Sequence, residues 1–190
     1  ATSVDADGKT PFQLLPADAS EDAATVLFEA SGAPPRPLWE MLDPPTAPPL
    51  STAEVRAAVE ADPGAAARPF MTPAGWAPTE GALVRLRPGL GDRKGLRAGQ
   101  LAIVARIDRD CNTTLRRWCD DDELGVFHPR ELVHGFHDWL PLHAAAALGL
   151  PAITLSVILR AHADAATMPD DDGKLPYQLV ASSSTDEAAT

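Results

Sequence analysis

The hydrophobic pattern along the chain divides it into helical and β-like parts. Outside residues 79–135, alanine-rich stretches repeat at helical spacing. Near the C-terminal end, Ile153, Val157, Ile158 and Ala161 fall at i, i+4, i+5 and i+8, which gives one face of a helix an apolar stripe. Inside the central segment, short β-branched or leucine-rich runs alternate with turns that contain Gly, Asp or Pro. We therefore expect helices on both sides of a β segment.

The helical parts carry signals for short paired helices. Pro141 suits the first turn of a helix, where its missing N–H group has no intrahelical partner to lose. Ala144 to Ala147 provide a face of small residues that a neighbouring helix can approach closely, and Gly149 ends the helix. Such a short pair cannot bury its apolar face alone, so the pairs are expected to stack.

Two phrases of the sequence recur. Residues 5–14 (DADGKTPFQL) match residues 170–179 (DDDGKLPYQL), and residues 57–66 (AAVEADPGAA) match residues 157–166 (VILRAHADAA). Part of the first phrase also returns at residues 139–145 (WLPLHAA), with its proline 35 residues before the proline of the last copy. Self-similarity at this spacing indicates an array of stacked units.

These phrases resemble the ankyrin repeat. The family signature Thr-Pro-Leu-His-x-Ala is matched by Leu140 to Ala145, which read Leu-Pro-Leu-His-Ala-Ala. The chain is most similar to a divergent type in which Asp-x-Asp-Gly-Lys-Leu-Pro begins each unit, as in residues 170–176. The resemblance implies stacked helix pairs that bind proteins on a concave surface. It also implies that His143 bonds backbone groups of neighbouring turns.

The central segment predicts four or five short strands. They are expected at residues 83–86, 101–107, 113–119 and 125–128, with turns at 108–112 and 120–123 and a turn of helix at 129–132. So many short strands in about 55 residues are typical of a small antiparallel barrel.

The same segment resembles the Mind-bomb/HERC-type domain, a Src-homology-3-like barrel found in some ubiquitin ligases. The likeness rests on residues 81–87, 99–108 and 129–133 together with Trp118. That family usually has aromatic residues in a hairpin, whereas the corresponding residues 91–95 of this chain contain none.

We therefore predict an α+β fold in which ankyrin-like helix-pair repeats flank a small antiparallel β-barrel. The expected organisation is an ankyrin-like repeat at 1–34, a degenerate proline-rich helical repeat at 35–70, the small β-barrel at 71–136, and ankyrin-like repeats at 137–190, the last of them incomplete.

Composition narrows the class of protein. The 19 prolines and 13 glycines exclude long uninterrupted helices and a coiled coil. No run approaches the roughly 18 apolar residues of a membrane span. No secretory signal is visible in this sequence, so we expect an intracellular protein without assigning its compartment. The chain lacks a starting Met, which favours a processed protein or a piece of a longer one.

Charge is distributed unevenly. The 27 acidic and 16 basic residues give a net charge of −11, but residues 79–135 are near +1 and the remainder is near −12. A strongly acidic chain is a poor general binder of nucleic acid. Acidic flanks favour a basic surface on the partner. Cys111 and Cys119 allow one disulfide or two free thiols, and the sequence leaves both states open.

Catalytic and cofactor-binding motifs are absent. The chain has no Gly-x-Ser-x-Gly, no Gly-x-Gly-x-x-Gly and no phosphate-binding Gly-x₄-Gly-Lys-Ser/Thr loop. We therefore predict no catalytic residue and no cofactor. The Asp-x-Asp-Gly phrases at Asp5 and Asp170 place Gly and Glu wrongly for an EF-hand, so a tight turn is favoured. His134 and His137 are the only close pair of zinc-ligand type, and we predict no metal site.

The favoured function is a non-catalytic protein–protein interaction scaffold, as a structural or accessory subunit or a fragment of a larger assembly. The partners would be other proteins of that assembly. Predicted partner-binding residues lie on the turns of the helix pairs and on the barrel: Asp138, Trp139, Asp170, Asp171, Asp172, Lys174, Arg116, Trp118 and Phe127.

Three alternatives stay open. The first is a substrate-binding or regulatory region of a ubiquitin ligase. The second is an RNA- or phosphate-binding barrel, with Arg85, Arg87, Arg116 and Arg117 on one face. The third is an enzyme whose site is built without a recognisable motif.

Overall fold

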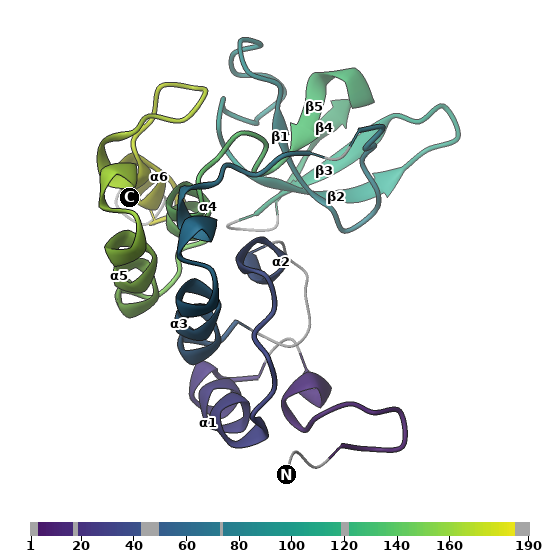
Figure 1. Ribbon diagram of the computed structural model, residues 1–190. Helices are drawn as coiled ribbons and strands as arrows, with labels where there is room; N and C mark the ends of the chain where they lie inside the picture. The colour runs from purple at the N-terminus through teal and green to yellow at the C-terminus, as the bar shows by residue number, and fades with distance from the viewer. Residues whose placement is uncertain (1–3, 17–18, 43–49, 73, 119–121, 185–190) are drawn as a thin grey trace.

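The computed structural model describes residues 4–16, 19–42, 50–72, 74–118 and 122–184. The chain is an α+β protein (Figure 1). Its α-helices in this part are α1 (Glu21–Ser31), α2 (Leu38–Leu42), α3 (Thr52–Ala61), α4 (Pro141–Ala147), α5 (Ala152–Ala161) and α6 (Pro176–Ser184). Short 3-10 turns are η1 (Phe12–Leu14), η2 (Pro63–Ala67), η3 (Pro129–Glu131) and η4 (Ala163–Thr167). In these residues no helix is long and apolar enough to cross a membrane.

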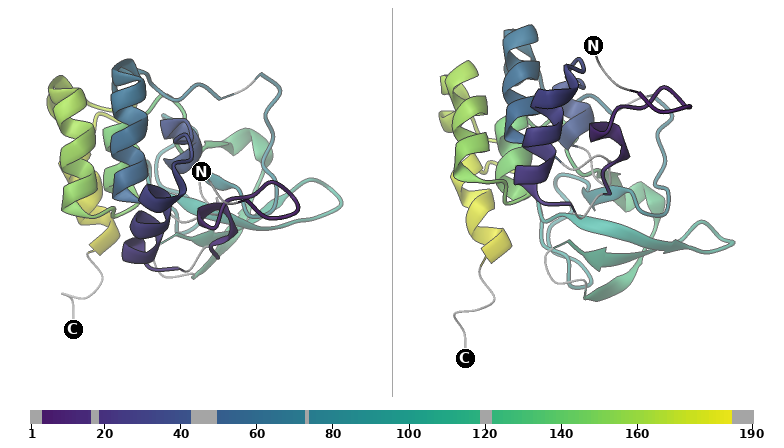
Figure 2. Two further views of the ribbon diagram at one scale, coloured as in Figure 1. Left: turned by 60° about the horizontal axis from the view of Figure 1, so that its bottom comes forward. Right: turned by 90° about the horizontal axis from the view of Figure 1, so that it is seen from below.

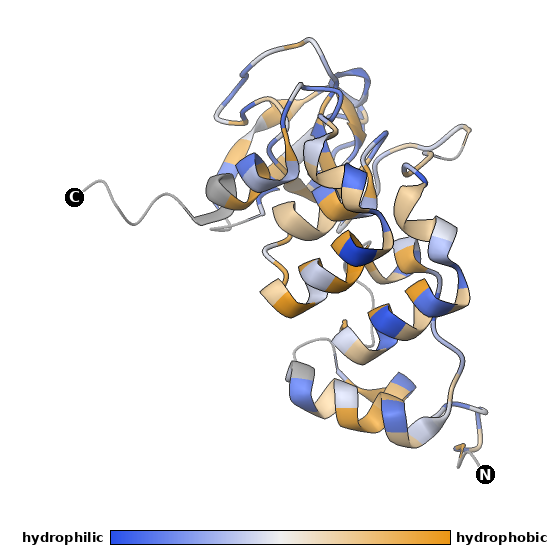
Figure 3. Cartoon of the chain, turned by 60° about the vertical axis from the view of Figure 1, so that its left-hand side comes forward, coloured by the Kyte–Doolittle hydropathy of each residue, from blue (hydrophilic) through white to orange (hydrophobic). Residues whose placement is uncertain are grey.

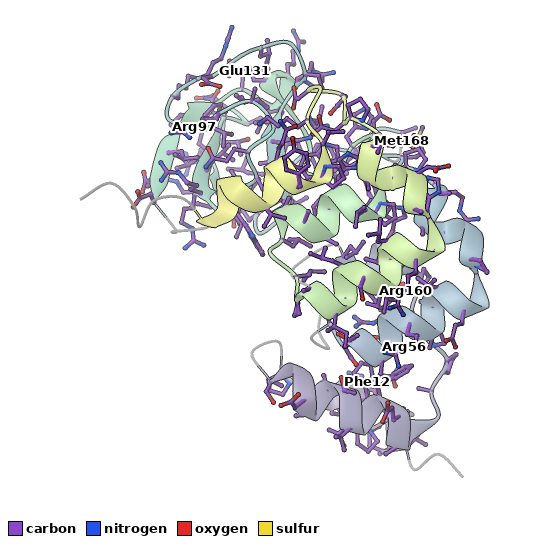
Figure 4. All side chains as sticks on the ribbon, turned by 90° about the vertical axis from the view of Figure 1, so that its left-hand side faces the viewer. Phe12, Arg56, Arg97, Glu131, Arg160 and Met168 are labelled. Atoms are coloured by element: carbon purple, nitrogen blue, oxygen red, sulfur yellow. The ribbon has the colours of Figure 1, made fainter. Side chains whose placement is uncertain are left out.

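The helices form two rows that lie side by side (Figures 1 and 2). One row contains α1, α3 and α5, and each helix packs on the next. The other row contains α2, α4 and α6, which pack in the same order, while α2 contacts α3 and α4 contacts α5. Apolar and polar residues alternate around α1, α3 and α5, as expected for helices covered on one side (Figure 3). Helix α4 is buried along its whole length.

Local signals account for the helix ends. The Ser20 Oγ atom accepts a hydrogen bond from the N–H of Ala23 at 3.3 Å and caps α1, which ends at the left-handed Gly32. Pro141 occupies the first turn of α4, as its sequence position predicts. Helices α3 and α5 both end in a residue of nearly the same backbone conformation, with φ of −140° at Asp62 and −146° at His162, which leads into a 3-10 turn. The two copies of the second phrase therefore share one local structure.

The two Asp-x-Asp-Gly phrases also share one structure, a closed turn. The Asp170 Oδ1 atom accepts the N–H groups of Asp172 at 3.0 Å and Lys174 at 2.7 Å, and residues 5–9 form the corresponding bonds. The glycine of each turn has φ of +77°, which favours glycine at that position. The carboxylate of the first aspartate in each phrase therefore accepts hydrogen bonds from the backbone of its own turn, as the tight-turn prediction requires.

The β segment forms one antiparallel sheet. Its strands are β1 (Leu83–Leu86), β2 (Ala102–Ile107), β3 (Thr113–Arg117), β4 (Glu123–Phe127) and β5 (Leu132–His134), in the order β4-β3-β2-β1-β5. Register shifts interrupt the β2–β3 and β3–β4 pairings. In the described part of the chain, β4 pairs only with β3 and β5 only with β1, so the sheet is open.

The predicted barrel is therefore wrong, and the packing around β1 explains why. All four residues of β1 are buried, so the strand is covered on both faces. Val84 and Leu86 belong to the core of the sheet, whereas Leu83 joins the core of the helices together with Phe136 and Trp139. A sheet that is covered by helices on one face needs no closure upon itself to bury that face.

The sheet lies within a connection between two helical elements. It begins after η2 and ends before α4, where the backbones of Phe70 and Trp139 meet. The Phe70 N–H donates to the Trp139 carbonyl at 2.8 Å, and the Asp138 N–H donates to the Phe70 carbonyl at 3.0 Å. At the corresponding position of the next pair of elements, η4 and α6 are joined by residues 168–175 alone, which contain the 170–174 turn.

Candidate functional site

The predicted partner-binding residues fall into buried and exposed groups. The side chains of Trp139 and Phe127 are fully buried, and Asp170 is 8% exposed. Asp138 is exposed, and Asp171 is exposed as a residue although its side chain is only 20% exposed. Asp172, Lys174, Arg116 and Trp118 are partly buried. The two aromatic residues are thus parts of the core. The Lys94 ammonium group lies over the Phe127 ring, 4.9 Å from its centre.

Several of these residues meet at one place, which we call the Arg85 junction (Arg85, Trp139, Asp171, Asp172 and Lys174). The Arg85 side chain has no exposed surface. Its Nη2 atom is 2.6 Å from Asp171 Oδ2 and its Nη1 atom is 3.3 Å from Asp172 Oδ2. The guanidinium carbon lies 5.2 Å from the Trp139 ring centre. A charge from the sheet is therefore neutralised by the turn before α6.

Further hydrogen bonds complete the junction. Arg85 also donates to the carbonyl of Gly135 at 3.1 Å and to that of His137 at 2.7 Å. The Lys174 Nζ atom donates to the Ala98 carbonyl at 2.7 Å. Burial raises the pKa of Asp172 above its usual range, and the Arg85 charge opposes that shift. These contacts hold the sheet against the helix rows.

The three consecutive aspartates are close enough to hold a metal ion, because oxygen atoms of Asp170, Asp171 and Asp172 lie within 4.8 Å of one another. The protein supplies its own cations there, since Arg85 contacts two of these carboxylates. Asp170 Oδ1 is engaged by the turn. Intramolecular pairing therefore accounts for Asp171, Asp172 and one oxygen of Asp170, whereas Asp170 Oδ2 is buried without a hydrogen-bond partner.

The predicted arginine face is not assembled. Arg85 is buried in the junction, and Arg117 lies 3.5 Å from the Asp122 carboxylate. Arg116 is partly buried on β3, beside Trp118, which packs against the helical core. Arg87, by contrast, is exposed.

His143 has a structural environment on α4. Its Nε2 atom donates to the Met168 carbonyl at 3.0 Å, a contact of the kind that the ankyrin resemblance implies. Burial lowers the pKa of His143 below its usual range, against the opposing charge of Asp170. The neutral imidazole is therefore the favoured form in the folded protein.

A groove lies at the β5 edge of the sheet, and we call it the edge groove. Its volume is about 390 Å³. The lining comes from the segment that enters the sheet (Thr72 and residues 75–78), from the end of β1 and η3 (Arg87, Pro129 and Arg130), and from β5 with the turn after it (residues 132–134 and His137).

Aromatic contacts order the wall of the edge groove. The rings of Phe70 and His134 are stacked with centres 4.3 Å apart, and Trp76 packs edge-on against His134 at 5.5 Å. The Thr72 hydroxyl lies 2.9 Å from His137 Nδ1, while His137 Nε2 is 3.3 Å from an Asp138 carboxylate oxygen. His134 and His137, considered above as metal ligands, thus shape this wall.

The opposite part of the edge groove is basic. The Arg87 N–H donates to the Glu131 carbonyl at 2.8 Å, and its Nε atom donates to the Arg130 carbonyl at 3.0 Å. No described residue forms an ion pair with the guanidinium group of Arg87 or Arg130. Both side chains line the groove, so their charges are available there.

A second, smaller cavity differs in charge. It has a volume of about 280 Å³ and lies beside Trp39, between α2 and α3. Its two arginines are paired inside the chain, because Arg36 binds the buried Glu54 at 2.8 Å and Arg68 binds Asp62. The edge groove is therefore the better candidate for binding a charged partner.

Sequence reasoning missed the edge groove because its walls come from three separate segments. Trp76 was not singled out, and Arg87 was assigned to a different face. The only signal that pointed there was the close spacing of His134 and His137.

Comparison with known proteins adds no assignment, since no family model, no curated protein and no solved structure matches the chain.

Proposed function

We propose that this chain is a non-catalytic protein-binding module whose edge groove receives a segment of a partner protein. The observation that carries the proposal is the edge groove itself, an aromatic and basic hollow at the border of the sheet. Grooves that bind peptides commonly combine an apolar anchor site with a few placed polar groups. Trp76 supplies the first, and Arg87 and Arg130 supply the second.

The helix rows support this proposal as a frame. They hold the sheet through the Arg85 junction and through the shared core around Trp139. The ankyrin resemblance remains a prediction that agrees with a binding role. A site on a rigid frame loses less conformational entropy when it binds a ligand, which favours affinity.

The experiment is a selection of displayed random peptides on the purified chain. Peptides are enriched on the wild type and then counter-selected on Trp76→Ala, a change in the groove wall. Circular dichroism confirms that the variant is folded. A matched control is Tyr177→Ala, which removes an exposed aromatic side chain of α6 that does not line the groove.

We expect peptides that bind the wild type and Tyr177→Ala but lose about tenfold or more in affinity on Trp76→Ala, as for an aromatic anchor residue. Peptides that bind folded Trp76→Ala as tightly as the wild type contradict the proposal. Failure to enrich any peptide on the wild type also contradicts it. A ligand that resembles a ubiquitin-pathway protein would favour the ligase alternative.

A further inference from the structure

The charged side chains that line the edge groove are all of one kind. Its described lining contains two arginines, Arg87 and Arg130, and no Asp or Glu. This basic site belongs to a chain whose net charge is −11. A positively charged groove on a chain of negative net charge points to a ligand of negative charge.

Two carboxylates stand next to lining residues in the sequence. Asp138 follows His137, and its carboxylate is 3.3 Å from His137 Nε2, so it lies beside the histidine and forms no ion pair with either groove arginine. Glu131 follows Arg130, but its Oε1 atom binds Arg93 at 3.0 Å and its Oε2 atom lies 3.5 Å from the Lys94 ammonium group. The same carboxylate accepts the His128 N–H at 2.8 Å, and this bond is the main reason why the pKa of Glu131 lies below its usual range. The Glu131 carboxylate therefore pairs with basic residues of the hairpin after β1 and not with the groove arginines.

One groove arginine, Arg87, has its side chain held in place before any ligand binds, and the other, Arg130, has its backbone fixed. The Arg87 Nε atom donates to the Arg130 carbonyl at 3.0 Å, so the first side chain is tied to the backbone of the second residue. Arg130 belongs to η3, and its backbone N–H donates to His128 Nδ1 at 3.1 Å. A preorganised guanidinium group loses less side-chain entropy when it binds a carboxylate.

We propose that the edge groove binds an acidic segment of a partner polypeptide. A Glu or Asp carboxylate of that segment pairs with Arg87 and Arg130, and a neighbouring apolar side chain packs on Trp76. The sequence alone suggests a basic partner surface for the acidic flanks, and the ligand proposed here occupies the groove instead. This inference rests on the proposed function above and adds the chemistry of the ligand.

The test uses two fluorescein-labelled peptide pools that share randomised apolar positions and carry either Glu or Gln at all other positions. Binding to the full chain is measured by fluorescence anisotropy. The groove variants are Arg87→Gln and Arg130→Gln. The matched control is Arg109→Gln, an exposed arginine in the turn between β2 and β3. A labelled single-stranded RNA of mixed sequence and a phosphoserine version of the Glu pool serve as further probes.

The Glu pool is expected to bind at least tenfold more tightly than the Gln pool. Each groove variant should weaken the Glu pool about fivefold, as for a partly exposed ion pair, and Arg109→Gln should leave it unchanged. A tenfold increase in salt concentration should weaken the Glu pool more than the Gln pool.

Three results would overturn the acidic-ligand proposal. They are equal affinity for both pools, a loss on Arg109→Gln as large as that on Arg87→Gln, and a preference for RNA or for the phosphorylated pool. If both pools bind equally and lose affinity on Trp76→Ala, the proposed peptide-binding function survives and only the charge assignment fails. If neither pool binds and the peptide selection is empty, both proposals fail.

Discussion

Replacement of Arg85 by Met is the sharpest test of how the sheet is held to the helix rows. Met keeps the length of the side chain but removes the charge and all of its hydrogen-bond donors. In the wild type, Arg85 is fully buried between the Asp171 and Asp172 carboxylates, which are 20% and 9% exposed. The variant leaves both carboxylates and the Gly135 and His137 carbonyls without this partner.

The size of the effect follows from these contacts. Removal of one member of a buried ion pair costs about 3–5 kcal/mol, because the other charge stays buried and uncompensated. Partial exposure of Asp171 allows water to reach one carboxylate, so we expect a loss of about 4 kcal/mol in the free energy of unfolding. For a chain of 190 residues this loss lowers the melting temperature by about 10 °C.

The assay is urea unfolding followed by circular dichroism, with Arg109→Met as the matched control. The control side chain is exposed, so its effect should stay within about 0.5 kcal/mol. The triple variant R85M/D171N/D172N removes the stranded charges and should recover at least half of the loss. A loss below about 1 kcal/mol for R85M would refute the claim that this junction secures the sheet.

Two further predictions concern pH and packing. The pKa of His143 is lowered in the fold, so the unfolded chain binds more protons below about pH 6.5, and the free energy of unfolding should fall as the pH drops through that range. His143→Asn should reduce this pH dependence, measured by urea unfolding at pH 7.5 and 5.5. An unchanged difference between the two pH values would contradict the prediction. A methyl group at Gly135 would lie 2.9 Å from the buried Leu83 side chain, so Gly135→Ala should cost about 1–3 kcal/mol by thermal unfolding. Gly64→Ala meets neighbours only at 3.4 Å or more and should be nearly neutral, and equal losses in the two variants would contradict the packing argument.

Local signals in the sequence were sufficient for most elements. Pro141 and Gly149 marked the ends of a helix, and the strands at 83–86 and 102–107 lie where alternation and apolar runs placed them. A fifth strand was allowed for but β5 was not located, because it has only three residues and follows a helical turn directly. Its existence depends on pairing with β1, which the local pattern does not encode.

Closure of the sheet was predicted wrongly for a related reason. A buried Leu83 and a buried Arg85 on the same strand are compatible with a barrel interior or with a helical cover. The difference depends on what packs on that face, and the covering residues Phe136 and Trp139 come from a distant part of the chain. Tertiary context of this kind decides the architecture after the strands are specified.

The candidate site was the feature of the protein that its sequence predicted least well. Asp171 and Asp172 looked like surface residues because aspartates are usually exposed, and their partner Arg85 is more than eighty positions away. Cys119, the other half of a possible disulfide, lies outside the described residues, whereas Cys111 is exposed with a free thiol. The groove arginines had no local pattern to distinguish them from other surface arginines.

The most direct test of the account is a map of ligand contacts on the folded chain. Uniformly ¹⁵N-labelled protein is titrated with the tightest peptide from the Glu pool, and amide and indole resonances are followed. We predict that the largest shifts occur at Thr72, at Trp76 and in residues 129–137, with little change on α6. Shifts concentrated at the exposed Tyr177 and Val180 of α6, with the edge groove unaffected, would contradict the central claim.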